Sequence, residues 1–220
     1  MTAVGPEERA RLLAAESLAA GDVTGWFERL YSAAQRGDAI VPWDHGGPHP
    51  LLVTWAAGRQ VSTGRALVVG AGLGGDAEFV AALGYACTAF DVSATAVQSA
   101  RERSPSSTVD YSVANLLEPP PEWRAAFDLV IESRTVQSIP RSVRAVATQN
   151  VASFVAPGGT LTVITSALDG GADPAAGPPW PLARAEVEAF AADGLTSVSI
   201  DLSADAEGPT ARCWLAEFTR

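Results

Sequence analysis

The hydrophobic pattern divides the chain into a helical N-terminal part and a longer part in which strands and helices alternate. Asp22 is the expected N-cap of the second N-terminal helix. We predict an N-terminal helical lid segment at residues 1–60 and the core of the same domain at residues 61–220. The segments with helical spacing of apolar residues in the first part are PEERARLLAAESLAA, DVTGWFERLYSAAQRGD and LLVTWAAGR.

From residue 65 onward, short apolar runs alternate with amphipathic segments. Ala66-Leu67-Val68-Val69 is bounded by glycine, as expected for a strand buried on both faces. Strands that alternate with helices predict an α/β fold with a largely parallel sheet covered on both faces. The later expected strands are YACTAFD, TVDYSVA, FDLVIE, TLTVIT, LTSVSIDL and TARCWLAEFT, the last two joined by Gly208-Pro209. The helices between them are expected in DAEFVAALG, SATAVQSARER, RSVRAVATQNVASFVA and LARAEVEAFAADG.

Composition narrows the classes of partner. The formal charge is −10 and all fifteen basic residues are arginine, which argues against a nucleic-acid surface and excludes lysine chemistry. The N-terminus is charged and no apolar run is long enough for a membrane span, so we expect a cytoplasmic protein. Richness in Ala, Gly, Pro and Arg suggests a bacterial source. Cys87 and Cys213 lack metal or redox spacing and are expected to be small buried apolar residues.

A glycine-rich loop carries the main chemical signal. VVGAGLGGD follows an expected strand and opens an expected helix, so Gly70, Gly72 and Gly74 let the backbone turn tightly and approach a ligand. Asp91 follows Gly70 by 21 residues, the spacing of a carboxylate that accepts hydrogen bonds from ribose hydroxyls. Taken alone, the motif fits a nicotinamide cofactor as well as S-adenosylmethionine.

Later features favour S-adenosylmethionine. Asn115 follows the third strand, FDLVIE supplies a fourth, and VAPGGTLTVI reads as helix, tight turn and strand. Their order resembles the class I S-adenosylmethionine-dependent methyltransferases over about residues 60 to 220. Val69 stands where many of these enzymes have an acidic residue, and Asn115 where aspartate is common. The resemblance implies a Rossmann-like seven-stranded, mostly parallel sheet with an antiparallel C-terminal strand. It also implies a cofactor site formed by Trp43, Gly70, Gly72, Gly74, Asp91, Val92, Asn115, Leu116 and Glu132.

The segment PWDHGGPHP narrows the resemblance. Pro42, Trp43, Gly46, Pro48 and Pro50 match a P-W-x-x-G-x-P-x-P pattern of thiopurine-methyltransferase-like enzymes, in which such a segment lies over the cofactor beside the acceptor pocket. The likeness implies a small, flat acceptor, in some cases heteroaromatic, with a sulfur, nitrogen or oxygen nucleophile. The two histidines of the chain fall on variable positions of the pattern.

His45 and His49 are the first candidates for a catalytic base, because an unperturbed imidazole titrates near pH ~6.5. The alternative is that both are solvated loop residues. Asp44 joins them in one proline-pinned turn, where three ligands would converge poorly, so no metal site is expected. Asp76 opens the helix after the glycine loop, and we expect it to cap that helix.

Further candidates lie at the expected acceptor pocket. Glu132 ends the fourth strand, where it could orient the acceptor or act as a base; alternatively it caps the next turn or pairs with Arg134. Arg134 is itself a candidate substrate contact. Trp180, in the loop at about 167 to 181, is a candidate wall of the pocket. Trp43 could cover the cofactor or stack on the acceptor, or it could simply anchor the loop.

The sequence therefore predicts methyl transfer from S-adenosylmethionine to a small molecule. A homodimer is left open, and neither nucleic acid nor a membrane is an expected partner. Two alternatives remain: an NAD(P)-dependent oxidoreductase, suggested by GxGxxG with Asp91, and a cofactor-binding regulatory protein that performs no chemistry.

Overall fold

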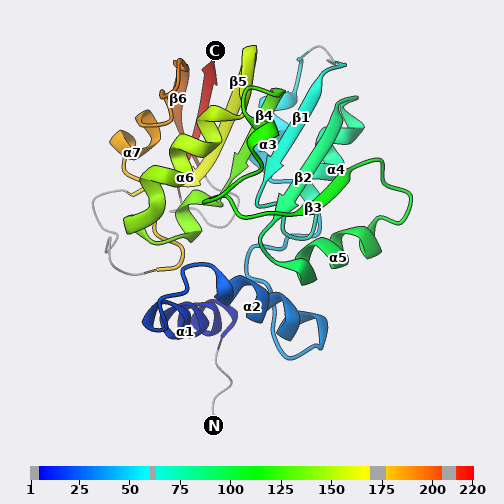
Figure 1. Ribbon diagram of the computed structural model, residues 1–220, viewed down its shortest axis with the longest axis vertical. Coiled ribbons are helices and arrows are strands. Elements are labelled where there is room, and N and C mark those ends of the chain that lie inside the picture. The colour runs from blue at the N-terminus through cyan, green and yellow to red at the C-terminus, as the bar shows by residue number, and fades with distance from the viewer. Residues whose placement is uncertain (1–4, 60–62, 169–176, 205–211) are drawn as a thin grey trace.

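The protein is built on one seven-stranded sheet with helices on both faces (Figure 1). The computed structural model describes residues 5–59, 63–168, 177–204 and 212–220. The strand order is β3-β2-β1-β4-β5-β7-β6, and β7 is antiparallel to both β5 and β6. This arrangement confirms the expected Rossmann-like fold. The strands are β1 Arg65–Val69, β2 Ala86–Asp91, β3 Asp110–Val113, β4 Phe127–Ser133, β5 Val155–Ser166, β6 Thr196–Ala204 and β7 Arg212–Thr219.

Both faces of the sheet are buried, as the apolar runs predict. Leu67 and Val69 of β1 point into the cluster that includes Val151 of α6, whereas Ala66 and Val68 join the cluster on the opposite face. The helices of the core are α3 Pro50–Ala56, α4 Gly75–Ala82, α5 Ala94–Arg103, α6 Arg141–Ser153 and α7 Arg184–Glu188, with short 3-10 turns η1 Pro121–Trp123 and η2 Val136–Ser138. The strand order reverses between β1 and β4, where open α/β sheets place their ligands.

Three local predictions need correction. The helix expected over residues 141–156 ends at Ser153, and PGG lies inside β5, where the register shifts between Phe127 and Leu129 of the paired strand β4. The last helix is shorter than expected, spanning Arg184–Glu188. Thr24, not Asp22, is the N-cap of α2, although Asp22 Oδ1 accepts a hydrogen bond from the Gly25 N–H at 2.8 Å. The expected turn at Gly208-Pro209 lies outside the described residues.

The N-terminal helices α1 Pro6–Ala19 and α2 Gly25–Gln35 lie across the end of the sheet at which β1 to β5 terminate (Figure 1). An aromatic cluster anchors them: Trp26 is fully buried and stacks on Phe27 at a centroid distance of 3.9 Å, and Trp43 meets Trp26 edge-on. α2 also packs against α5 of the core. None of the helices in the described ranges is long and apolar enough to cross a membrane. Cys87 and Cys213 are both buried, as expected.

The segment from Pro42 to Pro50 is attached directly to the first turn of α4. The backbone N–H of His49 donates to Asp76 Oδ1 at 2.7 Å, so Asp76 anchors this segment and forms no side-chain cap. A Cβ on Gly75 would overlap the carbonyl oxygen of Gly47. The glycine loop and the proline-rich segment are therefore in backbone contact.

This contact predicts that Gly75→Ala destabilises the protein. An added methyl group would meet backbone, which cannot rotate away, and overpacking of this kind costs about 1 to 3 kcal/mol. The better helix propensity of alanine offsets only about 1 kcal/mol of that cost. Urea unfolding should show a lower free energy of unfolding than for Gly47→Ala, the matched control, since a Cβ on Gly47 meets nothing within 4 Å. Equal stability of the two variants would contradict the contact.

Candidate functional site

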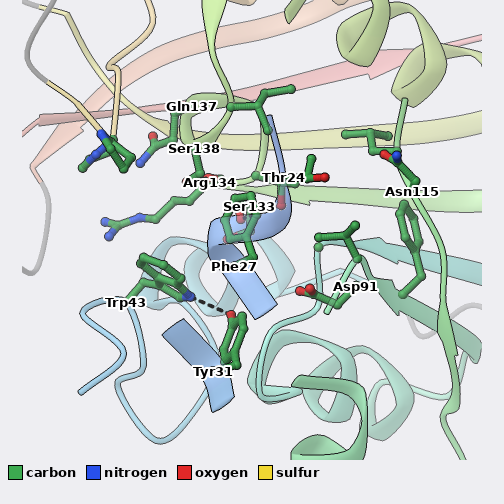
Figure 2. Close-up of a pocket in the computed structure, with 18 of the residues that line it drawn as sticks. Thr24, Phe27, Tyr31, Trp43, Asp91, Asn115, Ser133, Arg134, Gln137 and Ser138 are labelled. Atoms are coloured by element: carbon green, nitrogen blue, oxygen red, sulfur yellow. Dashed lines mark hydrogen bonds between the residues drawn. The ribbon is translucent and has the colours of Figure 1, made fainter. Parts of the chain in front are cut away.

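Two adjoining cavities lie where the strands β1, β2 and β4 end. The first has a volume of about 170 Å³ and the second about 90 Å³. Figure 2 labels residues of the first cavity from α2 and its N-cap, the Pro42–Pro50 segment, the ends of β2, β3 and β4, and η2. The walls shared by both cavities are Trp43, Gly70, Ser133 and Arg134.

The glycine loop forms the boundary between the two cavities. Gly70 has φ +61°, and a Cβ there would overlap the hydroxyl of Thr135, which donates to the Val69 carbonyl at 2.9 Å. Gly72 has φ +53°, in the left-handed region that favours glycine. Gly74 lies on neither wall. It is the N-cap of α4 with φ +91°, so it shapes the loop, and its expected contact with a ligand stays a prediction.

Asp91 is a buried carboxylate on the wall of the first cavity. Its Oδ2 accepts the Gly72 N–H and its Oδ1 accepts the Ser93 N–H, both at 2.9 Å. Burial raises the pKa of Asp91 to about 6, against the lowering effect of these backbone donors, and the nearby negative charge of Glu28 raises it further. The backbone N–H of Val92 is a third donor to this carboxylate, which offers about four acceptor sites, so capacity remains for an added donor such as a ribose hydroxyl.

The residues after β2 and β3 continue the same wall. Val92, Asn115 and Leu116 all line the first cavity, as the sequence predicts. Asn115 Oδ1 accepts the Leu117 N–H at 2.9 Å, which fixes the amide and leaves one lone pair for another donor. The wall of the first cavity therefore combines the side-chain amide of Asn115, the carboxylate of Asp91 and the backbone of Gly70.

α2 supplies a wall that the sequence analysis did not predict. Thr24, Phe27 and Tyr31 line the first cavity, and the indole N–H of Trp43 donates to the Tyr31 hydroxyl at 2.9 Å (Figure 2). Burial raises the pKa of Tyr31 well above its usual range, so it remains a neutral hydrogen-bonding group. Phe27 and Tyr31 follow helical spacing, and such a pattern cannot distinguish a residue that faces a core from one that faces a cavity.

Both histidines line the second cavity and not the first. His49 is 8% exposed and is the N-cap of α3, where its Nδ1 accepts the Leu51 N–H at 3.2 Å. This contact favours a structural role over the expected catalytic one for His49, whereas the role of His45 stays a prediction. In the described ranges, no group of three or more His, Cys, Asp or Glu side chains is arranged to hold a metal ion.

Two expected site residues line neither cavity. Glu132 is 0% exposed, accepts the Val136 N–H at 2.8 Å and lines neither cavity, so the structure favours a role in holding η2 over direct contact with ligand. Burial raises the pKa of Glu132 to about 7. Trp180 donates its backbone N–H to the Gln137 carbonyl and does not line the first cavity. Pro178 and Pro179, just before it in the chain, line that cavity instead. Residues 169–176 of the expected loop lie outside the described residues.

Arg134 and Trp43, both expected to contact the substrate, border both cavities. Arg134 has φ +63°, a left-handed conformation that a non-glycine residue adopts at a cost of about 1 to 3 kcal/mol. Its N–H donates to the Ile164 carbonyl at 2.8 Å, which holds the backbone there. Strain of this kind is often stored at functional sites.

Comparisons of the sequence and the fold with known proteins found methyltransferases. A family described as a methyltransferase domain matches residues 66–159. Thiocyanate methyltransferase 1 of Brassica oleracea is 28% identical over 201 residues, which is 90% of this chain and 83% of that protein. A structure from work on the conversion of a disulfide bond into a thioacetal group during echinomycin biosynthesis has a TM-score of 0.71 at 25% identity, covering 88% of this chain and 91% of that one.

A second similar fold belongs to a structure solved with ligands bound. The 1,6-didemethyltoxoflavin N1-methyltransferase of Burkholderia thailandensis, solved with S-adenosylhomocysteine, has a TM-score of 0.68 at 16% identity and covers 88% of this chain and 86% of that one. The protein is a methyltransferase.

The residues present fit the cofactor of this methyltransferase. The loop at Gly70 and Gly72 exposes backbone to both cavities, which any Cβ would obstruct or strain. Asp91 presents a buried carboxylate at the end of β2, where a ribose with two hydroxyl donors is the natural partner. Burying this charge for no ligand would be costly, because an ionised carboxylate loses its hydration there.

The pKa of Asp91 predicts that cofactor binding by the methyltransferase depends on pH. Above pH 6 the carboxylate is ionised and accepts hydrogen bonds; below that pH it takes up a proton and loses acceptor capacity. The affinity for S-adenosylhomocysteine should be highest above pH 7 and fall by up to about tenfold per pH unit below 6. Titration calorimetry from pH 5 to 8 measures this dependence.

Asp91→Asn should bind weakly at every pH and lose the pH dependence, because an amide has no charge to titrate in this range. Asp110→Asn, at the exposed start of β3, is the matched control and should behave as the wild type. A pH profile that survives in Asp91→Asn would assign the titration to another group.

Proposed function

We propose that the enzyme transfers the methyl group of S-adenosylmethionine to a sulfur nucleophile of a small molecule. The observation that carries the proposal is the shape of the first cavity. Besides Asp91 and Gly70, its lining includes the apolar side chains of Phe27, Ile139 and Pro178, to which we assign the acceptor end. This space suits a small acceptor, and the formal charge of −10 disfavours a nucleic acid as the substrate.

The cofactor is assigned to residues on both walls. Asp91 would accept the ribose hydroxyls, and Val92, Asn115 and Leu116 would surround the adenine. The backbone at Gly70 and Gly72 would receive the methionine portion, beside the polar second cavity. Trp43 borders both cavities, so its ring can cover the sulfonium and attract it by a cation–π interaction. Bound S-adenosylmethionine supplies the activated methyl group.

The acceptor end favours an acceptor that needs no dedicated base. Besides Glu7 and the side chains assigned to the cofactor, the polar groups that line the cavity in the described ranges are hydroxyls, one amide and one guanidinium, from Thr24, Tyr31, Ser133, Thr135, Ser138, Gln137 and Arg134. The carboxylates on the cavity wall are Asp91, assigned to the ribose, and Glu7, which is exposed. A thiol with pKa near ~8.5 is partly ionised at neutral pH, whereas a hydroxyl acceptor is close to requiring a base. Holding a thiolate in line behind the methyl group is then the main catalytic task.

The relatives support sulfur as the acceptor atom. One is a thiocyanate methyltransferase, and one structure concerns the conversion of a disulfide into a thioacetal. The likeness of PWDHGGPHP to the thiopurine-methyltransferase-like pattern points the same way, and it extends the proposal to flat, heteroaromatic thiols. From composition we also propose a bacterial, cytoplasmic enzyme.

Release of S-adenosylhomocysteine in a panel of thiols, phenols and amines tests the proposal. We expect turnover with small aromatic or aliphatic thiols that exceeds turnover with phenols or amines of similar size. Turnover confined to phenols or amines would overturn the assignment of sulfur. Binding of S-adenosylhomocysteine without turnover of any acceptor would favour the regulatory alternative, and binding of NADH instead would favour the oxidoreductase.

The histidines provide a second prediction. His45→Ala should retain most of kcat, far from the ~10²- to 10⁴-fold loss that removal of a general base causes, because His45 does not line the acceptor end. His49→Ala should lower the free energy of unfolding by about 1 kcal/mol through loss of the α3 cap, with a similarly small effect on kcat. Steady-state kinetics and urea unfolding of the two variants measure both effects. A base-sized loss of kcat in either variant would restore its catalytic role.

A further inference from the structure

The carboxylate of Glu28 on α2 receives four hydrogen bonds. Its Oε1 accepts the Ser32 hydroxyl at 2.8 Å and the Thr95 hydroxyl at 2.5 Å. Its Oε2 accepts the Ser93 hydroxyl at 2.6 Å and the Thr95 N–H at 3.1 Å. Three of these donors belong to Ser93 and Thr95, at the N-terminus of α5. Glu28 therefore joins the N-terminal helices to the core at one defined point.

Ser93 links this point to the cofactor site. Its backbone N–H donates to Asp91 Oδ1 at 2.9 Å, while its hydroxyl donates to Glu28 and accepts the Ala96 N–H as the cap of α5. Ser93 is fully buried, so these contacts cannot be exchanged for water without moving the backbone. A continuous chain of hydrogen bonds thus runs from Glu28 through Ser93 to Asp91.

The same helix forms a wall of the site. Phe27 and Tyr31 flank Glu28 on α2 and line the cavity that Asp91 lines. Any displacement of α2 would therefore change the cavity wall and the support of Asp91 together. Apolar contacts alone would let α2 slide along the core, because they are non-directional. Four hydrogen bonds to one carboxylate depend on distance and angle, so they fix the position and orientation of α2.

We propose that Glu28 is a positioning residue that couples docking of the N-terminal helices to cofactor binding at Asp91. The inference rests on the proposed role of Asp91 as acceptor for the ribose. Coupling between two equilibria is reciprocal, so the cofactor must favour docking of α2 to the same degree that docking favours the cofactor.

Charge provides a readout that a merely structural contact would not affect. The hydrogen bonds from Ser93, Thr95 and Ser32 outweigh burial and lower the pKa of Glu28 to about 2, so it is ionised throughout the range of interest. That charge raises the pKa of Asp91. Among the described residues, the other ionisable side chains that line the cavity with Asp91 are Tyr31 of α2, whose own pKa Asp91 raises, Glu7 of α1 and Arg134 after β4.

Glu28→Gln tests the proposal by calorimetry with S-adenosylhomocysteine from pH 5 to 8. We expect binding about fivefold to tenfold weaker at pH 7.5, the lower part of the range found for coupled sites, because the amide cannot accept all four donors. We also expect the midpoint of the pH profile to move to lower pH, because a negative charge near Asp91 is lost. Glu16→Gln is the matched control: Glu16 pairs with Arg29 across α1 and α2, is 63% exposed, and is bonded to no residue of α5.

Hydrogen exchange of residues 24–35 tests reciprocity. S-adenosylhomocysteine should increase protection of α2 in the wild type and in Glu16→Gln, and much less in Glu28→Gln. Ser93→Ala gives a second variant if Glu28→Gln folds poorly: it breaks the link to Glu28 while Thr95 and Ser32 still hold α2, and it should lose the same coupling.

The outcomes separate the two proposals. Glu28→Gln and Ser93→Ala that match Glu16→Gln in affinity, pH midpoint and protection would overturn the coupling and leave the proposed function intact. A wild type that binds no S-adenosylhomocysteine at any pH would overturn the cofactor assignment, and the coupling with it. A stability loss in Glu28→Gln with an unchanged pH midpoint and unchanged ligand-induced protection would reduce Glu28 to a structural contact.

Discussion

The site depends on a carboxylate that is buried where strand β2 ends. Asp91 is 6% exposed, and an ionised group in such a place must recover by hydrogen bonding what it loses in hydration. The N–H groups of Gly72 and Ser93 supply part of that recovery. Both donors require special backbone: Gly72 adopts a left-handed conformation, and Ser93 caps α5. The glycine loop, the helix cap and the carboxylate are therefore one structural unit, which a ribose would complete.

The part of this unit that is local in sequence was predictable. Asp91, Val92 and Asn115 follow buried strands directly, and parallel strands bring their carboxyl ends to the same edge of the sheet. The alternation of strands and helices did not predict the antiparallel β7, which the family resemblance implied, and the strand order came only from the structure. PGG was predicted to be a turn before the fifth strand, but β5 begins at Val155 and includes these residues. The register shift beside them is an irregularity that a hydrophobic pattern does not reveal.

Residues that reach the site from a distance were not predictable. Phe27 and Tyr31 of α2 line the cavity, and Glu28 bonds to Ser93, which lies more than 60 residues away in the sequence. The helical spacing of apolar residues in α2 does not indicate which distant residues the helix will contact. Glu132 shows why the sequence left two roles open, of which capping the next turn is the one that its hydrogen bond to Val136 favours. Alternation along β4 puts its side chain on the face of Val130, which packs with Val151 of α6, so the end of a strand is not by itself a position on the cavity wall.

The two kinds of contact that hold the N-terminal helices have different consequences. The aromatic cluster of Trp26, Phe27 and Trp43 supplies apolar burial, which keeps α1 and α2 attached but is nearly non-directional. The hydrogen bonds of Glu28 supply little net energy for their number, because water would offer the same partners in the undocked state. Their contribution is geometric: they select one docked position out of many that the aromatic cluster allows. In a reaction that relies on alignment of the acceptor with a methyl group more than on a base, the wall carried by α2 must be placed within a fraction of an ångström, and directional contacts are the ones that can do so.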